Sequence, residues 1–204
     1  KNLCLAGGVA LNCVANGKIL QNGKFQNIWI QPAAGDAGGS LGAALGFWHT
    51  ELKNNRIIKS NDSMNGSYLG PEYSQNEVEK KLKEIGANFV VLDDEQLIEK
   101  TVLELCSGKV VGWFQGRMEF GPRALGCRSI LGDARSETMQ KTLNLKIKYR
   151  ESFRPFAPSV IREDLPTWFD LNCDSPYMLL VSGVANEKRR IMTEEEKAFF
   201  GIDK

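Results

Sequence analysis

Basic side chains gather in two short runs, GRMEFGPRALGCRS at 116–129 and KIKYRESFRPFAPS at 146–159. Glycine, proline and apolar residues interrupt both runs, whereas a solvated charge run would be polar throughout. A guanidinium group binds a planar oxyanion through two parallel hydrogen bonds, so these arginines favour a pocket for phosphate or carboxylate. The candidate anion-binding residues are Arg117, Arg123, Arg128, Lys148, Arg150 and Arg154.

The second run has a spacing that suits such a pocket. Lys148, Arg150 and Arg154 have the same parity, so an extended chain places them on one face. Like charges on one face destabilise a fold unless an anion compensates them, and bound phosphate would do so. A surface network of salt bridges stays open as an alternative, with acidic partners at Glu119, Asp133, Glu137 and Glu151.

Two glycine turns each follow a strand-like run and precede a helix-like run. The first is GGVALN at 7–12, where Gly7 and Gly8 would let a nucleotide or phosphate approach the backbone. The N–H groups of the following helix would point at that turn, and Asn12 is a candidate ligand donor. The same glycines could instead serve only the geometry of the turn.

The second turn, GDAGGSLGAAL at 35–45, holds a carboxylate among glycines. Asp36 could bind a metal ion or a nucleotide hydroxyl, and Gly38 and Gly39 would let phosphate or ribose reach the main chain. Helix capping by Asp36 or Ser40 is the competing interpretation. Neither turn is a P-loop, because no G-x-x-x-x-G-K-[ST] string occurs.

The elements that would position these residues alternate between strand and helix, which predicts an α/β fold. The first two units are a strand at 2–6 with a helix at 9–20, and a strand at 25–31 with a helix at 41–52. Beyond the polar stretch 53–67 we expect a helix at 75–86 with a capping box from Ser74 to Glu77. The further expected elements are a strand at 88–94, a helix at 95–107, a strand at 109–116, a helical start in 136–149, an extended segment at 150–164 and a strand at 175–184.

Composition narrows the class of protein. The chain has 204 residues, 42% hydrophobic and 25% charged, as in a soluble globular protein. The net charge of +1 provides no global basic field, which argues against nucleic acid and anionic lipid as partners. No apolar stretch approaches the ~20 residues that span a bilayer. Five cysteines without a C-x-x-C pair indicate reduced thiols in the cytoplasm. We interpret Cys127 as a small packing residue rather than a nucleophile.

At these motifs the chain resembles the O-carbamoyltransferases of the nodulation-factor, cephamycin and tobramycin type. The resemblance covers nearly the whole chain in collinear order. It is carried by GGVALN (7–12), GDAGGSLGAAL (35–45), YLGP (68–71), WFQGRMEFGPRALGCRSIL (113–131) and KYRESFRPFAPSV (148–160). It implies the C-terminal remnant of an actin/sugar-kinase-like domain at 1–56, a linker at 57–70, and a partial YrdC-like domain at 71–204.

The resemblance also implies an activity, the ATP-dependent transfer of a carbamoyl group from carbamoyl phosphate, through carbamoyl adenylate, to a hydroxyl of a small-molecule or sugar acceptor. The six basic residues would bind carbamoyl phosphate. Asp36 would ligate a divalent metal, iron or magnesium. The nucleotide and the adenylate would contact Gly7, Gly8, Asn12, Asp36, Gly38 and Gly39.

One departure from the family pattern limits these expectations. The family's metal site also takes histidines from earlier in its first domain, whereas this chain has only His49, outside any ligand motif. We therefore expect a fragment that cannot complete carbamoyl transfer by itself but could bind carbamoyl phosphate. Two alternatives stay open, an anion- or nucleotide-binding module without catalysis of its own and an RNA-binding YrdC-like domain. The sequence leaves the oligomeric state open.

Overall fold

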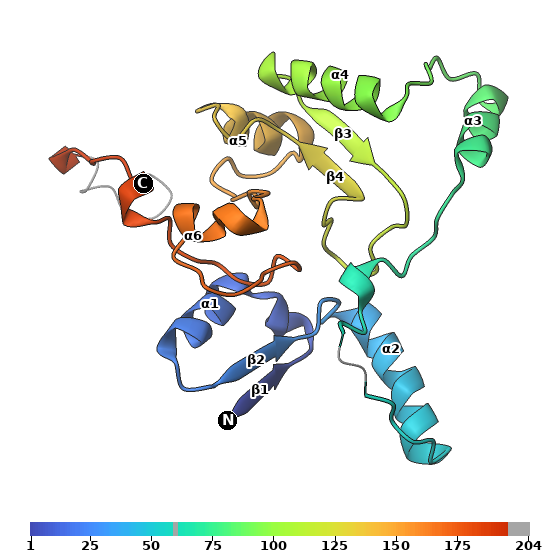
Figure 1. Ribbon diagram of the computed structural model, residues 1–204, viewed down its shortest axis with the longest axis vertical. Coiled ribbons are helices and arrows are strands. Elements are labelled where there is room, and N and C mark those ends of the chain that lie inside the picture. Colours follow the sequence, from blue (N-terminus) through green and yellow to red (C-terminus); the bar gives the residue numbers. More distant parts are fainter. Residues whose placement is uncertain (59–60, 196–204) are drawn as a thin grey trace. The chain divides into compact units, whose positions relative to one another are not determined.

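The computed structural model describes residues 1–58 and 61–195 and is mixed α/β, as expected. Its secondary structure comprises two small sheets and six α-helices among these residues (Figure 1). Residues 59–60 of the expected linker and 196–204 of the expected second domain lie outside the described residues.

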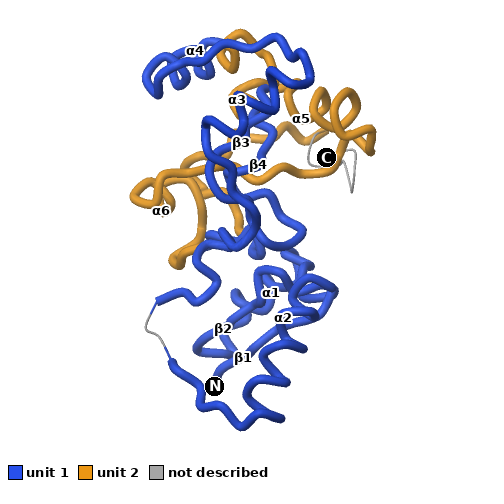
Figure 2. The backbone as a smooth tube through the Cα atoms, turned by 90° about the vertical axis from the view of Figure 1, so that its right-hand side faces the viewer, with its two compact units in different colours: residues 1–103, 111–131, 175–181 blue, residues 104–110, 132–174, 182–204 orange. Residues whose placement is uncertain are grey.

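The chain forms two compact units, drawn in different colours in Figure 2. Unit 1 comprises residues 1–103, 111–131 and 175–181. Unit 2 comprises residues 104–110, 132–174 and those from 182 onward. Each unit is described below by itself.

Unit 1 begins with a strand–helix–strand arrangement that confirms the first expected elements. Strand β1 (Asn2–Leu5) pairs in parallel with β2 (Asn27–Ile30), and helix α1 (Cys13–Asn22) connects them. Helix α1 ends at Gly23, whose φ of 68° lies in the left-handed region that glycine adopts without strain. The buried Asn16 of α1 donates hydrogen bonds to the carbonyl oxygens of Ala10 and Leu179, which fixes the segment 175–181 against this helix.

Helix α2 (Asp36–Gly46) starts earlier than the expected helix at 41–52 and continues into a wider turn at Phe47–Glu51. Its glycines favour a turn by local propensity. However, Gly38 packs so closely on the segment before the helix that a Cβ atom there would collide with the carbonyl oxygen of Ala33. The helix therefore begins within the segment that local preference suggests as a loop, and Gly38 allows the close contact with the residues before it.

The later part of unit 1 holds the expected α3, α4 and β3, together with a strand that the sequence did not reveal. Helix α3 (Gln75–Glu84) begins with the predicted capping box of Ser74 and Glu77. Helix α4 (Asp94–Cys106) runs from unit 1 into unit 2. Strand β3 (Val111–Phe114) pairs antiparallel with β4 (Arg128–Leu131), and Phe114 lies opposite Arg128.

Two expected strands, 88–94 and 175–184, are wrong. Residues 88–93 form no ladder, and α4 begins at Asp94. In the second segment, Val184 makes only an isolated bridge with Phe169. Apolar β-branched sequence indicates an extended chain, but a strand also needs a neighbour to exchange hydrogen bonds with, and no described strand pairs with either segment.

Unit 2 contains two short helices, α5 (Met139–Thr142) and α6 (Leu165–Trp168). A wider helical turn at Leu143–Ile147 continues α5, so the expected helical start is confirmed. Met139 and Leu143 are buried against Gly132, where an added Cβ would come within 2.9 Å of Met139. Residues 150–161 of the expected extended segment are non-helical, as the prolines predicted, whereas its last residues, Arg162–Asp164, form a 3-10 helical turn that leads into α6. None of the helices described in either unit has the length and apolarity needed to span a membrane.

Candidate functional site

The first glycine turn presents an open backbone. Gly7 has a φ of 91°, which favours glycine, and apart from the adjacent residues no heavy atom lies within 4 Å of a Cβ placed at Gly7 or Gly8. Asn12 is the N-cap of α1, because its side-chain oxygen accepts a hydrogen bond from the N–H of Ala15 at 3.1 Å. The oxygen of this expected ligand donor is therefore committed to the helix.

The second glycine turn leaves Asp36 exposed in the first turn of α2. The N-cap is Gly35, and Ser40 donates its hydroxyl to the carbonyl oxygen of Ala37, so neither Asp36 nor Ser40 caps the helix as the competing interpretation required. Gly38 is needed by the chain's own packing. At Gly39, by contrast, an added Cβ would meet nothing within 4 Å beyond the helix's own backbone, and the Gly39 N–H donates to the carbonyl oxygen of Gly35 at 3.1 Å.

Asp36 does not by itself form a metal centre. Within residues 1–58 and 61–195, no group of three or more His, Cys, Asp and Glu side chains lies together as a metal site. The only histidine, His49, contacts the carbonyl oxygen of Asn54 through its Nδ1 atom. The described residues therefore do not fit a complete metal site, and Asp36 could supply one ligand at most.

The first arginine run forms a loop in unit 1 that closes around a buried carboxylate. The Glu119 side chain has no exposed surface. Its Oε1 atom accepts hydrogen bonds from the N–H groups of Leu125 at 2.8 Å and Cys127 at 2.7 Å. Burial acts to raise the pKa of Glu119, but these N–H donors and the nearby Arg128 hold that pKa below its ordinary value. Glu119 is therefore a carboxylate that joins the two ends of the loop.

Arg128 is directed into this same loop. Its Nε atom lies 3.2 Å from Oε2 of Glu119, and its Nη2 atom donates to the carbonyl oxygens of Gly121 and Arg123 at 2.5 and 3.1 Å. Cys127 is buried between these groups, and burial and the Glu119 charge raise the pKa of its thiol. A thiol with a raised pKa is a poor nucleophile, which agrees with the expectation that Cys127 is filler.

The arginine loop packs on both glycine turns within unit 1. The Nη2 atom of Arg123 donates to the carbonyl oxygen of Leu11, in the GGVALN motif, at 2.9 Å. Gly121 has a φ of 120° and lies so close to the second turn that an added Cβ would be 3.0 Å from the Cβ of Ala33. The Nε atom of Arg123 is buried and has no hydrogen-bond partner among the described residues. The structure thus brings Arg123 and Arg128 together with the candidate nucleotide turns.

Arg117 is held elsewhere in unit 1. Its guanidinium donates to the carbonyl oxygen of Gly70 at 2.9 Å and to the Glu72 carboxylate at 2.6 Å, and about half of its side chain is exposed. For this arginine, the structure shows a surface ion pair of the kind that the alternative interpretation described.

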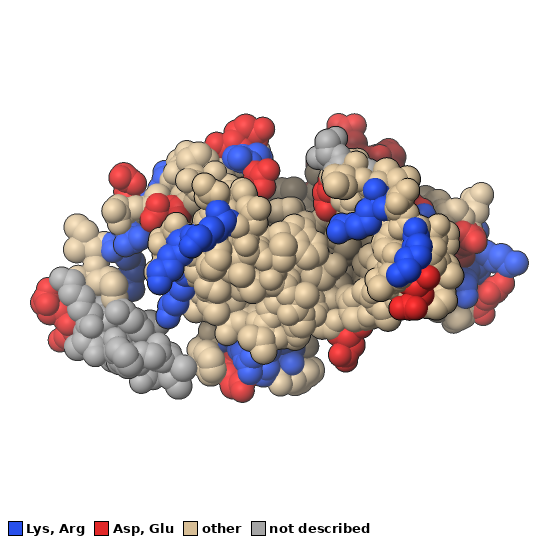
Figure 3. All heavy atoms as spheres, turned by 90° about the horizontal axis from the view of Figure 1, so that it is seen from below, with Lys and Arg blue, Asp and Glu red and all other residues tan. Residues whose placement is uncertain are grey.

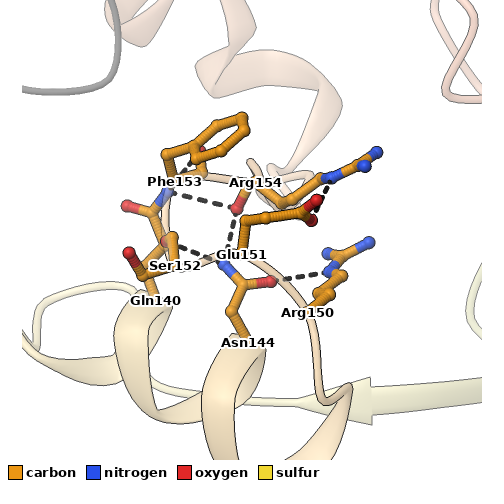
Figure 4. Close-up of polar contacts among 7 residues, drawn as sticks. All are labelled: Gln140, Asn144, Arg150, Glu151, Ser152, Phe153 and Arg154. Atoms are coloured by element: carbon orange, nitrogen blue, oxygen red, sulfur yellow. Dashed lines mark hydrogen bonds and ion pairs between the residues drawn. The ribbon is translucent and has the colours of Figure 1, made fainter.

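The second arginine run forms a separate cluster in unit 2 (Figure 4). The Nε atom of Arg150 donates to Oδ1 of Asn144 at 2.7 Å, and the guanidinium lies 5.0 Å from the centre of the Phe156 ring. Arg154 pairs through Nε with Glu151 at 3.0 Å. Figure 4 shows the ends of Arg150 and Arg154 extending to the same side, with the Glu151 carboxylate between them in that view. Lys148 is exposed and its backbone N–H closes the preceding helical turn.

The carboxylate of Glu151 is the counter-ion of the Arg150–Arg154 cluster. The hydrogen bond from Arg154, together with the charges of Arg154 and Arg150, lowers the pKa of Glu151 below its ordinary value. An incoming anion would meet two cations that already share one exposed negative charge.

Comparison with known proteins assigns both parts of the chain. Residues 1–45 match the sequence model described as the carbamoyltransferase N-terminus, and residues 102–196 match the model described as the carbamoyltransferase C-terminus. The chain belongs to the carbamoyltransferase family. The family resemblance drawn from the motifs is thereby confirmed.

Three relatives illustrate the range of this carbamoyltransferase family. An uncharacterized protein of Synechocystis is 59% identical over 100% of this chain and 34% of its own length. The nodulation protein NolNO of Sinorhizobium fredii is 42% identical over 94% of this chain and 28% of its own length. The 3'-hydroxymethylcephem-O-carbamoyltransferase of Streptomyces clavuligerus is 34% identical over 91% of this chain and 33% of its own length. The chain thus spans about a third of the length of the curated relatives that it matches.

The sequence analysis missed the structural role of two residues that organise the arginine clusters, Glu119 and Asn144. Glu119 stood out only as a possible surface partner of the arginines, and Asn144 did not stand out at all. The one local signal for Asn144 is a polar residue between Leu143 and Leu145 in a helical run. Its burial, at 0% exposure, becomes visible only in the fold.

Proposed function

We propose that this chain takes part in ATP-dependent O-carbamoyl transfer, in which carbamoyl phosphate is the donor and a hydroxyl of a small molecule or sugar is the acceptor. The observation that carries the proposal is the Arg150–Arg154 cluster. Both guanidinium ends extend to the same side in Figure 4, and Asn144 bonds to the Nε atom of Arg150 and to the carbonyl oxygen of Arg154. The family membership supports the class of enzyme, and the name of the cephem relative supports a hydroxyl-bearing acceptor.

The proposed chemistry has three steps. Carbamoyl phosphate is hydrolysed to carbamate and phosphate. A carbamate oxygen then attacks the α-phosphorus of ATP, which forms carbamoyl adenylate and releases pyrophosphate. Finally the acceptor hydroxyl attacks the carbamoyl carbon, loses its proton and displaces AMP, which leaves the carbamoylated product.

In this scheme the arginines bind and stabilise the departing phosphate. Lys148 and Arg154 of unit 2 are exposed and Arg150 is partly buried, and fixed cations stabilise the negative charge that develops on a leaving phosphate. We also assign to carbamoyl phosphate the residues Arg117, Arg123 and Arg128 of unit 1, each to be tested by its own substitution. The contacts of Arg128 within its loop favour a supporting role over direct binding.

The nucleotide is assigned to the two glycine turns of unit 1. Gly7, Gly8 and Gly39 leave their backbone open, so a phosphate or ribose could approach there without a clash. Asn12 and Gly38 line the same turns but serve the fold through a cap and a close contact. We propose an actin/sugar-kinase-like origin for this part and a YrdC-like origin for the residues beyond it. No step is assigned to a metal, because Asp36 stands without further ligands among the described residues.

The distribution of charged side chains supports RNA binding less than it supports a local anion site. On the face drawn in Figure 3, Lys and Arg side chains lie among neutral residues, several of them beside acidic side chains. The net charge of +1 points the same way.

The direct test is calorimetric titration with carbamoyl phosphate. Saturable one-site binding that is lost in Arg154→Ala supports the proposal. Arg162→Ala is the matched control, because Arg162 is also an exposed arginine of unit 2 paired with an acid, Asp174, outside the cluster. Arg123→Ala tests the unit 1 loop in the same way. Absence of binding in a folded unsubstituted protein, or equal losses in Arg154→Ala and Arg162→Ala, would overturn the assignment.

A further inference from the structure

Asn144 is a buried polar side chain of unit 2 that forms hydrogen bonds through both ends of its amide. It lies in the helical turn Leu143–Ile147 and is 0% exposed. Its Nδ2 atom donates to the carbonyl oxygens of Ser152 at 2.9 Å and Arg154 at 2.8 Å. Its Oδ1 atom accepts from Nε of Arg150. Both ends of the amide are therefore satisfied, as the burial of a polar group requires.

These bonds determine the path of the segment 150–154 (Figure 4). This segment belongs to no helix or strand, so its carbonyl groups find no partners in a regular ladder. Asn144 provides two such partners from within the fold, and Gln140 adds weaker bonds to the carbonyl oxygens of Phe153 and Arg154 at 3.3 and 3.2 Å. Without Asn144, the segment that carries Arg154 would lose its buried support.

Asn144 also holds Arg150 at two points. The backbone N–H of Arg150 donates to the carbonyl oxygen of Asn144 at 3.0 Å, in addition to the side-chain bond. The chain reverses just before, at Tyr149, whose φ of 49° is unusual for a residue other than glycine. With Nε facing Asn144 and the guanidinium over Phe156, the terminal nitrogens of Arg150 face outward.

We infer that Asn144 is a positioning residue for anion binding, which aims Arg150 through its side chain and Arg154 through its backbone. The inference rests on the proposed function, because the anion is taken to be the phosphate group of carbamoyl phosphate. Asn144 itself is buried beneath the segment and does not touch the ligand. Its contribution is to keep two guanidinium groups in one orientation before binding, which removes the need to order them when the anion arrives.

The experiment compares Asn144→Ala with the unsubstituted protein, in the form that the cell produces. The first readout is the mobility of the Arg150 Nε–H group, followed by ¹⁵N relaxation without ligand. We expect this group to be rigid in the unsubstituted protein and mobile in Asn144→Ala. Equal mobility in both proteins would overturn the inference, whatever the ligand proves to be.

The second readout is the dissociation constant for carbamoyl phosphate. We expect Asn144→Ala to weaken binding about tenfold in the unsubstituted background and by a smaller factor in an Arg150→Ala background, where only its support of the Arg154 backbone remains to be lost. A loss of the same size in both backgrounds would show that Asn144 does not act through Arg150 and would contradict the inference.

Leu143→Ala is the matched control. Leu143 is the buried neighbour of Asn144 and packs against Gly132, so its truncation loosens unit 2 without removing any bond to the segment 150–154. We expect unchanged carbamoyl phosphate affinity at a temperature where this variant is folded. If the unsubstituted protein shows no affinity for carbamoyl phosphate, the proposed function fails, while the mobility of Arg150 still decides whether Asn144 positions it.

Discussion

The carboxylate of Glu119 and the guanidinium of Arg128 lie 3.2 Å apart at the neck of one loop, and the Glu119 side chain is entirely buried there. Each residue also bonds to the backbone of that loop, Glu119 through its acceptor oxygen and Arg128 through its donor nitrogen. The Glu119–Arg128 pair therefore holds the two ends of the loop together. Arg123, which lies in this loop, donates a hydrogen bond to Leu11 of the first glycine turn.

Removal of the Glu119 carboxylate is expected to destabilise the fold strongly. Glu119→Ala leaves the N–H groups of Leu125 and Cys127 without their acceptor and Arg128 without its counter-ion, so we expect a loss of about 3 kcal/mol in the free energy of unfolding. Denaturant titration measures it. Glu72→Ala is the control, because Glu72 is half exposed beside Arg117 and should cost less than about 1 kcal/mol. Equal losses of stability in both variants would contradict the stabilising role of the buried Glu119 carboxylate.

The same carboxylate predicts a pH dependence. The fold holds the pKa of Glu119 below its ordinary value of 4.5, so the unfolded chain binds this proton more readily than the folded chain does. The stability from Glu119 is therefore complete above about pH 4.5 and is lost as the pH falls through the folded value. We expect the stability gap between the unsubstituted protein and Glu119→Gln to narrow between pH 6 and pH 3. A gap that stays constant over this range would refute the prediction.

The two central glycines of α2 should respond oppositely to alanine. Gly38→Ala forces a Cβ against the carbonyl oxygen of Ala33 and should cost about 1–3 kcal/mol of stability. Gly39→Ala meets no neighbour and should be stabilising by up to about 1 kcal/mol, because alanine is the better helix former. Thermal unfolding distinguishes the two variants.

The Gly39→Ala variant also tests the proposed nucleotide site. In the folded Gly39→Ala protein, ATP affinity should fall, and an unchanged affinity would remove Gly39 from that site.

Glu151 is expected to compete with the incoming anion. Its carboxylate bonds to Arg154 and lies beside Arg150, so phosphate must share or displace it. Glu151→Gln should therefore tighten carbamoyl phosphate binding a few-fold, as measured by calorimetry, with little change in stability because the ion pair is exposed. Weaker binding in Glu151→Gln would show instead that the carboxylate orients Arg154 for the ligand.

Features that depend on neighbours in the chain could be predicted from the sequence alone. The capping box needs only Ser74 and Glu77, three positions apart, and the strand at 2–5 follows from a short apolar run ended by glycines. The two arginine runs and the family that they indicate likewise depend on residue order, which no fold is needed to recognise. The expected strands at 88–94 and 175–184 failed because an extended segment becomes a strand only when a partner lies beside it.

The amino-acid sequence by itself thus determined the α/β alternation, the basic character of both loops and the carbamoyltransferase family of the chain. Only the tertiary structure decided which partners the arginine and lysine side chains of those loops contact and which of them stay exposed. Glu119 and Asn144 look like ordinary polar residues in the sequence, and each becomes the centre of a loop because folding buries it. A buried carboxylate or amide must find partners, and here the partners are the backbone groups and arginines of the loops themselves.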